Sequence, residues 1–101
     1  MNLTVTDAPD KHRFEAWTDG KLAGFAAYSV RNGVIEFLHT EVDPAYEGKG
    51  VGAALARAAL DDAAARGARV QAFCPFIADW IDRHPEYQPL TGTADGTENP
   101  G

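Results

Sequence analysis

Three glycines at alternate positions, Gly48, Gly50 and Gly52, surround Lys49 immediately before the segment with the strongest helical pattern in the chain. Glycine costs a helix interior about 1 kcal/mol relative to alanine, so helix formation alone does not explain them. A helix start exposes backbone N–H groups without internal partners and carries about half a positive charge. Without Cβ atoms, the segment lets an anion approach these N–H groups, and Lys49 adds a positive charge. The pattern predicts a site for a phosphate or pyrophosphate group.

Two familiar phosphate-binding motifs do not fit this segment. A Walker loop requires a Gly-Lys pair followed by Ser or Thr, whereas Lys49 is followed by Gly50. A dinucleotide fingerprint requires a third glycine where Leu55 stands, three positions after Gly52. A loop whose glycines only permit a sharp turn stays as an alternative, and the order of the surrounding elements favours the anion site over it.

Short segments typical of strands precede the loop, at residues 3–6, 13–18, 21–30 and 34–40. The pair Asp19-Gly20 and the pair Asn32-Gly33 separate neighbouring segments. Such pairs accept the positive φ angles that tight hairpin turns need. The sequence therefore predicts that the second, third and fourth strands form an antiparallel meander.

Beyond Pro44 the hydrophobic period changes to that of a helix. Residues 50–66 form an amphipathic helix by their spacing, with an inner face made of Gly52, Leu55, Ala56, Ala59, Leu60 and Ala63. Gly67 is its expected C-terminal stop. Residues 69–74 are typical of a strand, and the strand–helix–strand order favours a parallel pair with a right-handed crossover. With a short helix over residues 76–83, the prediction is a single α+β (mixed α/β) domain.

Composition narrows the classes of partner and compartment. The chain has 101 residues, enough for one domain, and a formal charge of −6 from 15 acidic and 9 basic residues. That charge opposes nucleic-acid binding, which usually rests on a basic patch. Cys74 is the only cysteine, so neither an internal disulfide nor a cysteine-based zinc site is available. No stretch approaches about 18 apolar residues, so we expect a cytoplasmic protein without membrane or metal.

The element order and several short motifs resemble the GNAT superfamily of acyl-CoA-dependent N-acetyltransferases. The family pattern places Gln or Arg three residues before a Gly-x-Gly or Gly-x-Ala unit. Residues 47–52 follow this pattern, except that Glu47 stands in place of the usual first residue. The string HTEV followed by P-x-Y-E-G-K-G-V-G, with CPF, W and HPEY downstream, is similar to a short single-domain subfamily. That subfamily lacks the usual final strands and has a cysteine after the strand beyond the main helix. The resemblance covers roughly residues 3–90.

This resemblance implies a binding site for acetyl-CoA or coenzyme A. In the family the pyrophosphate lies on the amides of the glycine loop, here Glu47, Gly48, Lys49, Gly50, Val51 and Gly52. The pantetheine arm runs beside the strand before the loop, which here implies contacts with Thr40 and Val42, with Val42 as the backbone contact. Because the carboxylate of Glu47 would repel a diphosphate, its side chain is expected to point away.

The same resemblance places three candidate catalytic residues near the thioester: His39, Glu41 and Cys74. Acetyl transfer needs a proton acceptor for the amine, donors for an oxyanion and a proton for the leaving thiolate. Histidine, with an ordinary pKa of about 6.5, suits the first task, and strand alternation places His39 on the face of Ile35 and Phe37. Glu41 is a second possible base, while Cys74 either forms an acyl-cysteine or lines the pocket. Purely structural roles are the alternative for all three.

The resulting prediction is an N-acetyltransferase that acts on a small-molecule or peptide amine. Because the chain lacks the C-terminal hairpin that helps to form the acceptor pocket in larger relatives, the alternative is a CoA-binding module without transferase activity. An interaction domain that has lost the cofactor is a third possibility. The aromatic residues Phe76, Trp80 and Tyr87 are expected to close the core. The domain is predicted to span residues 1–90, followed by a disordered tail over residues 91–101.

Overall fold

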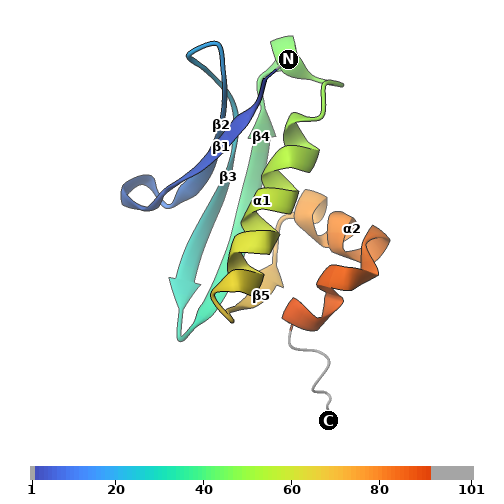
Figure 1. The fold of residues 1–101 in the computed structure, drawn as a ribbon. Helices are drawn as coiled ribbons and strands as arrows, with labels where there is room; N and C mark the ends of the chain where they lie inside the picture. The colour runs from blue at the N-terminus through green and yellow to red at the C-terminus, as the bar shows by residue number, and fades with distance from the viewer. Residues whose placement is uncertain (1, 92–101) are drawn as a thin grey trace.

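The computed structural model describes residues 2–91. Five strands form one sheet in the order β1-β2-β3-β4-β5, in which β1 to β4 run antiparallel and β5 is parallel to β4 (Figure 1). The strands are β1 Thr4–Ala8, β2 Arg13–Thr18, β3 Lys21–Arg31, β4 Val34–Val42 and β5 Arg69–Ala72. The helices are α1 Val51–Ala65 and α2 Pro75–Arg83, with 3-10 turns at Pro9–Lys11, Pro44–Tyr46 and Pro85–Thr91. The predicted α+β fold and its meander are confirmed.

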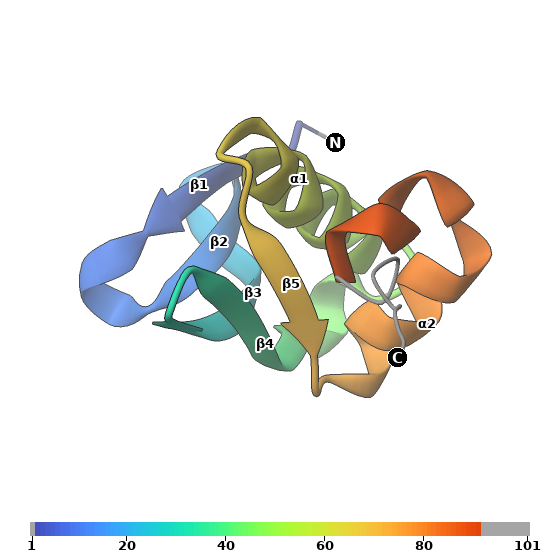
Figure 2. The same cartoon turned by 90° about the horizontal axis from the view of Figure 1, so that it is seen from below.

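Both helices lie on one face of the sheet, which we call the inner face (Figure 2). A single core forms between them, and its largest fully buried side chains are Phe37, Leu55, Leu60, Ile77, Val51 and Val70. On α1 the inner face is alanine-rich, and Ala56, Ala59 and Ala63 are completely buried. Small side chains let the helix axis approach the sheet closely, so the start of α1 is held next to the end of β4. The opposite, outer face carries no helix within residues 2–91.

A β-bulge in β4 corrects one prediction. Ala27 pairs with His39 and Tyr28 pairs with Phe37, so Leu38 is an extra residue without a partner on β3. The bulge interrupts the alternation of faces. Ile35 and Phe37 are therefore inner residues, whereas His39 lies on the outer face and is exposed. The expectation that His39 shares a face with those two residues was wrong.

Several boundaries differ from the expected ones. The strand predicted over residues 34–40 continues to Val42, and the strand predicted over 69–74 ends at Ala72 because Pro75 begins α2. The predicted tail lies almost wholly outside the described residues. Within residues 2–91 no helix combines the length and apolar character that a bilayer crossing requires, and no cluster of His, Cys, Asp and Glu side chains suits a metal ion. The cytoplasmic location stays a prediction.

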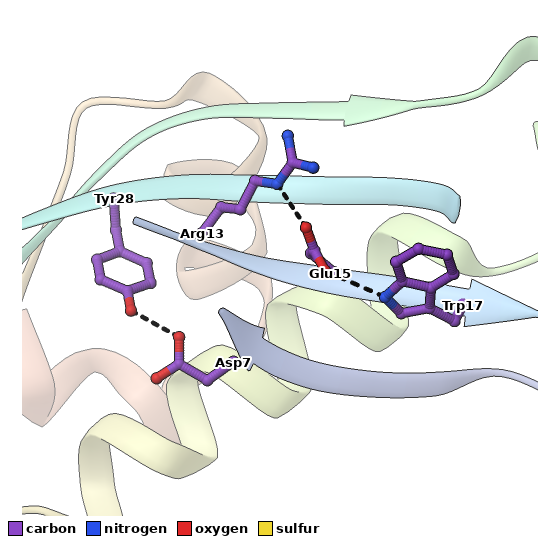
Figure 3. Close-up of polar contacts among 5 residues, drawn as sticks. All are labelled: Asp7, Arg13, Glu15, Trp17 and Tyr28. Carbon is purple, nitrogen blue, oxygen red and sulfur yellow. Dashed lines mark hydrogen bonds and ion pairs between the residues drawn. The ribbon is translucent and has the colours of Figure 1, made fainter. Parts of the chain in front are cut away.

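Polar side chains are fixed on both faces of the sheet (Figure 3). On the outer face, Glu15 is only 6% exposed and accepts hydrogen bonds from Arg13 Nε at 2.8 Å and Trp17 Nε1 at 3.2 Å. Burial alone would raise the pKa of Glu15, but these hydrogen bonds and the charges of Arg13 and Lys11 outweigh it, so the pKa lies below its ordinary value. Glu15 is thus an ionised, fully paired carboxylate.

On the inner face, Tyr28 donates a hydrogen bond to Asp7 Oδ1 at 2.6 Å, and this contact predicts a pH dependence of stability. Burial, helped by the bond and by the charge of Asp7, raises the pKa of Tyr28 to about 12. In the unfolded chain a tyrosine has a pKa of about 10. The stabilisation of the fold by the Tyr28–Asp7 contact is therefore complete below that pH and is lost as the pH rises toward the pKa of Tyr28 in the folded state.

We therefore expect Tyr28→Phe to destabilise the fold by about 1 kcal/mol at pH 8, and the difference from wild type to shrink by roughly 1 kcal/mol at pH 11. Urea unfolding at the two pH values measures it. Tyr46→Phe is the matched control, because no hydrogen bond of the Tyr46 hydroxyl is found among residues 2–91. A difference that does not change with pH would contradict the assignment.

Candidate functional site

The loop before α1 has the backbone conformation that its glycines predict. Gly48 has φ 78° and Gly50 has φ 83°, and a Cβ at either position would meet no other atom within 4 Å. Their conformation, and not crowding, therefore explains these two glycines. Gly50 is the N-cap of α1, which has no side-chain cap and no acidic residue in its first turn.

Unpaired amides gather at this helix start. Among residues 2–91, no acceptor is found for five backbone N–H groups, those of Gly48, Gly50, Val51, Gly52 and Ala53. The first intrahelical bond runs from Ala54 N to Gly50 O at 3.0 Å. Several N–H donors and the positive end of the helix dipole are thus available together, which is the arrangement that binds phosphate groups.

Two details of the expected anion site are corrected. The N–H of Lys49 is not available, since it donates to Tyr46 O at 3.2 Å as the loop turns. Gly52 is glycine for another reason than expected: a Cβ there would lie 2.7 Å from Cζ of Phe76. The absence of a Cβ lets the tip of the Phe76 ring lie directly against the start of α1.

Within residues 2–91, no strand pairs with the edge of β4 beside this loop, which we call its free edge. The parallel pairing of β4 with β5 ends at Phe37 and Ala72, and the amides of Phe73 and Cys74 both donate to Phe37 O, at 2.9 and 3.0 Å. Asp43 N donates to Ala23 O on β3 at 2.8 Å. Because bonding alternates along an antiparallel strand, the backbone N–H and C=O groups of Thr40 and Val42 point away from β3, toward the side that β5 has left.

A groove of about 380 Å³ joins the loop to this free edge. Its lining comes from β4, the loop, the first turn of α1 and α2: Val42, Glu47, Gly48, Gly50, Val51, Gly52, Ala53, Phe76, Asp79, Trp80 and Arg83. Sequence reasoning assigned Phe76 and Trp80 of this wall, together with Tyr87, to the core; only Tyr87 is buried, whereas Phe76 is exposed and Trp80 is partly buried against the core. The spacing of Phe76, Trp80 and Arg83 along one helical stripe was the available signal. Trp80 Nε1 is buried and has no acceptor among the described residues.

The candidate catalytic residues do not form one cluster, because β4 separates them. On the inner side, Cys74 is 3% exposed and its thiol donates to Thr40 Oγ1 at 3.3 Å. On the outer side, His39 Nε2 lies 3.3 Å from Glu41 Oε2, and both side chains are exposed. The structure thus pairs Cys74 with Thr40 and His39 with Glu41.

A second groove, of about 410 Å³, lies across the strand from the first. It is lined by Leu22, Ala23, Gly24, Phe25, Glu41, Val42, Asp43 and Pro44. Val42 lines both grooves, so this residue of β4 forms the partition between them. A ligand on the free edge and a ligand on the outer face can therefore approach each other at β4.

Comparison with proteins of known sequence and structure agrees with this geometry. The sequence profile of the family described as GCN5-related N-acetyl-transferase matches residues 13–90. A GCN5-like protein from Staphylococcus aureus, solved by NMR, superimposes with a TM-score of 0.68 over 88% of this chain and 87% of its own, at 24% identity, which supports the fold. Streptothricin acetyltransferase from Streptomyces lavendulae is 44% identical over 64 residues, which are 61% of this chain.

The structure of a larger enzyme is also similar to this chain. Nourseothricin acetyltransferase matches with a TM-score of 0.52 and 32% identity over 74% of this chain. The chain spans 34% of the length of the streptothricin enzyme and 47% of the nourseothricin enzyme. The family profile, by contrast, covers most of this chain. The resemblance seen in the sequence is therefore confirmed, and the chain belongs to the GCN5-related N-acetyltransferase family.

Proposed function

We propose that this chain binds acetyl-CoA in the groove between β4 and α2 and transfers the acetyl group to an amine. The observation that carries the proposal is the placement of unpaired amides at the start of α1 beside the free edge of β4. An anion and an extended chain with amide groups are the two ligand parts that such a site accommodates. Acetyl-CoA contains both, as a diphosphate and a pantetheine arm.

Each part of the groove has a role in this proposal. The amides of Gly48, Gly50, Val51, Gly52 and Ala53 hold the diphosphate. The backbone groups of Thr40 and Val42 pair with the pantetheine arm as a neighbouring strand would. The unpartnered Nε1–H of Trp80 offers a further donor in the groove wall. Acetyl-CoA supplies the thioester, which is an activated acyl group.

The residues on the outer side of β4 prepare the acceptor. An amine must lose its proton before it can attack a thioester, and His39 or Glu41 accepts that proton, directly or through water. The two side chains lie 3.3 Å apart, so an acceptor that reaches one of them also reaches the other. The open outer face leaves this pair accessible to an acceptor, because no helix covers it within residues 2–91.

For Cys74 we propose a lining role. A cysteine nucleophile needs thiolate character, which a base within hydrogen-bond reach or another pKa-lowering feature provides. The Cys74 thiol donates to the hydroxyl of Thr40, and His39 lies on the other side of the strand. Direct transfer from the thioester to the amine is therefore the favoured route.

The names of two relatives support this function. One is named for acetylation of streptothricin and the other for acetylation of nourseothricin, so both names indicate a small-molecule acceptor. We extend only that class to this chain.

The test has a binding arm and a turnover arm. Calorimetry with CoA and acetyl-CoA measures binding, and transfer of a radiolabelled acetyl group to a panel of amines measures activity. We expect His39→Gln/Glu41→Gln to lower turnover at least ~10-fold at unchanged CoA affinity, and Cys74→Ala to retain most of the activity. Acetyl label trapped on Cys74 would overturn the direct route. Binding without turnover would favour the CoA-binding module, and no binding would reject the proposal.

A further inference from the structure

The centre of the outer face holds a guanidinium group in a fixed position. Arg13 Nε donates to Glu15 Oε2 at 2.8 Å, and Arg13 Cζ lies 4.6 Å from the centroid of the Phe25 ring. The Arg13 side chain is only 24% exposed, although no helix within residues 2–91 covers it. Two contacts and partial burial thus restrain a side chain that is usually mobile.

The two terminal nitrogens of this guanidinium remain available for binding a ligand. Its bond to Glu15 uses Nε, and the two terminal nitrogens point away from the carboxylate (Figure 3). Among residues 2–91 these terminal nitrogens have no hydrogen-bond acceptor. A planar pair of N–H donors of this kind matches the two oxygens of a carboxylate, and its restrained geometry lowers the ordering cost of binding.

The surroundings place Arg13 at one end of the proposed acceptor region. Arg13, Ala27 and His39 stand opposite one another on β2, β3 and β4, and the methyl group of Ala27 leaves space between the two larger side chains. In the next row, Phe25 lies beneath the guanidinium and its ring centroid is 6.1 Å from that of His39. Phe25 thus forms an apolar floor from Arg13 to the His39–Glu41 pair.

The two ends of this floor offer different groups to a ligand. At one end Arg13 is paired with Glu15 through Nε and presents its terminal N–H donors, whereas Glu41 and Asp43 contribute carboxylates to the outer groove, which Phe25 also lines. Neighbouring strands are about 4.8 Å apart, so a ligand whose carboxylate meets Arg13 above β3 reaches β4 with an amine a few carbon atoms away. A zwitterion with an apolar spacer complements all three features.

We infer that the acceptor is an amino acid whose amine is separated from its carboxylate by a short aliphatic chain, and that Arg13 binds this carboxylate. The inference rests on the proposed function, which it makes more specific. Arg13 is then the residue that selects acceptors with a carboxylate, and Glu41 attracts the ammonium end next to the site of transfer.

The experiment compares δ-aminovaleric acid with its amide, which differ only in the carboxylate charge. With acetyl-CoA and the full chain, we expect kcat/KM at least ~10-fold higher for the acid. Arg13→Gln should remove this preference, mainly through KM, while the amide changes less than ~2-fold. Because Arg13→Gln leaves Glu15 without its cation, the double variant Arg13→Gln/Glu15→Gln is measured as well. This double variant has no unpaired charge at this place and should show the same loss of the preference for the acid.

A second readout is independent of turnover. Two-dimensional nitrogen–proton NMR follows the indole N–H of Trp17, which donates to Glu15, during titration with the acid, the amide and acetate. We expect a saturable shift with the acid that is absent in Arg13→Gln. No shift, or equal kcat/KM for the acid and the amide, would overturn the inference. A saturable shift without acetylation of any amine would instead reject the proposed function and leave the carboxylate site in place.

Discussion

Gly50→Glu is expected to weaken CoA binding at least ~100-fold while the chain stays folded. The substitution puts a carboxylate at the N-cap of α1, where the unpaired amides lie. That carboxylate would accept hydrogen bonds from the amides and repel the diphosphate. Two like unit charges about 4 Å apart repel each other by about 1 kcal/mol in water and by about 4 kcal/mol near a protein surface, and the loss of the anion site adds to this.

The change also strains the backbone, and a matched control isolates that effect. Gly50 has a φ of 83°, which costs a non-glycine residue about 1–2 kcal/mol. Gly20 has φ 74° and open space for a Cβ, and it lies in the turn between β2 and β3. Gly20→Glu therefore adds the same strain and charge without touching the groove. Calorimetry should find the affinity of this control unchanged, and equal affinities in the two variants would disprove the anion site.

Gly24→Ala is expected to destabilise the domain by about 2–3 kcal/mol, which lowers the melting temperature by roughly 8–20 °C in a domain of this size. A Cβ at Gly24 would lie 2.6 Å from the carbonyl oxygen of Glu41 and 3.0 Å from Cγ1 of Val51. A backbone oxygen cannot turn aside as a side chain can, so β3 and β4 must separate. That movement also displaces Val42, and CoA affinity should fall along with stability.

The control for this crowding is Gly52→Ala. Its Cβ would lie 2.7 Å from Cζ of Phe76, which is the tip of a ring that is 41% exposed and can rotate away. Alanine also favours a helix over glycine by up to about 1 kcal/mol. Thermal unfolding of this variant should stay within a few degrees of wild type. If Gly24→Ala were equally mild, the close approach of β3 to β4 at Val42 would be in error.

Most of the fold was readable from the sequence because local signals and the hydrophobic pattern agree. The Asp19-Gly20 and Asn32-Gly33 pairs do form turns, with all four residues at positive φ. The inner face of α1 was predicted almost residue for residue, except that Val51 is buried in place of Gly52. In these segments the period of the pattern is a direct consequence of burial on one side.

The site was less predictable, since it depends on departures from regular periods. The bulge at Leu38 has no local sequence signal, and it moved His39 to the outer face. The groove wall on α2 was missed because Phe76 and Trp80 look like core residues in a pattern count, although Phe76 is 41% exposed. The pairing of Cys74 with Thr40 joins residues 34 positions apart and depends on where β5 leaves β4.

The bulge at Leu38 also determines which side chains the interior has to accept. If Leu38 instead took its place in regular alternation, His39 and Glu41 would turn beneath the helices, and Thr40 and Val42 would turn to the outer face. Two ionisable groups would then lie in the apolar interior. Cys74, which lies there, has no charged partner among residues 2–91. Because the bulge leaves Leu38 without a partner on β3, the residues after it keep their faces, and polar chemistry and hydrophobic packing stay compatible within one strand.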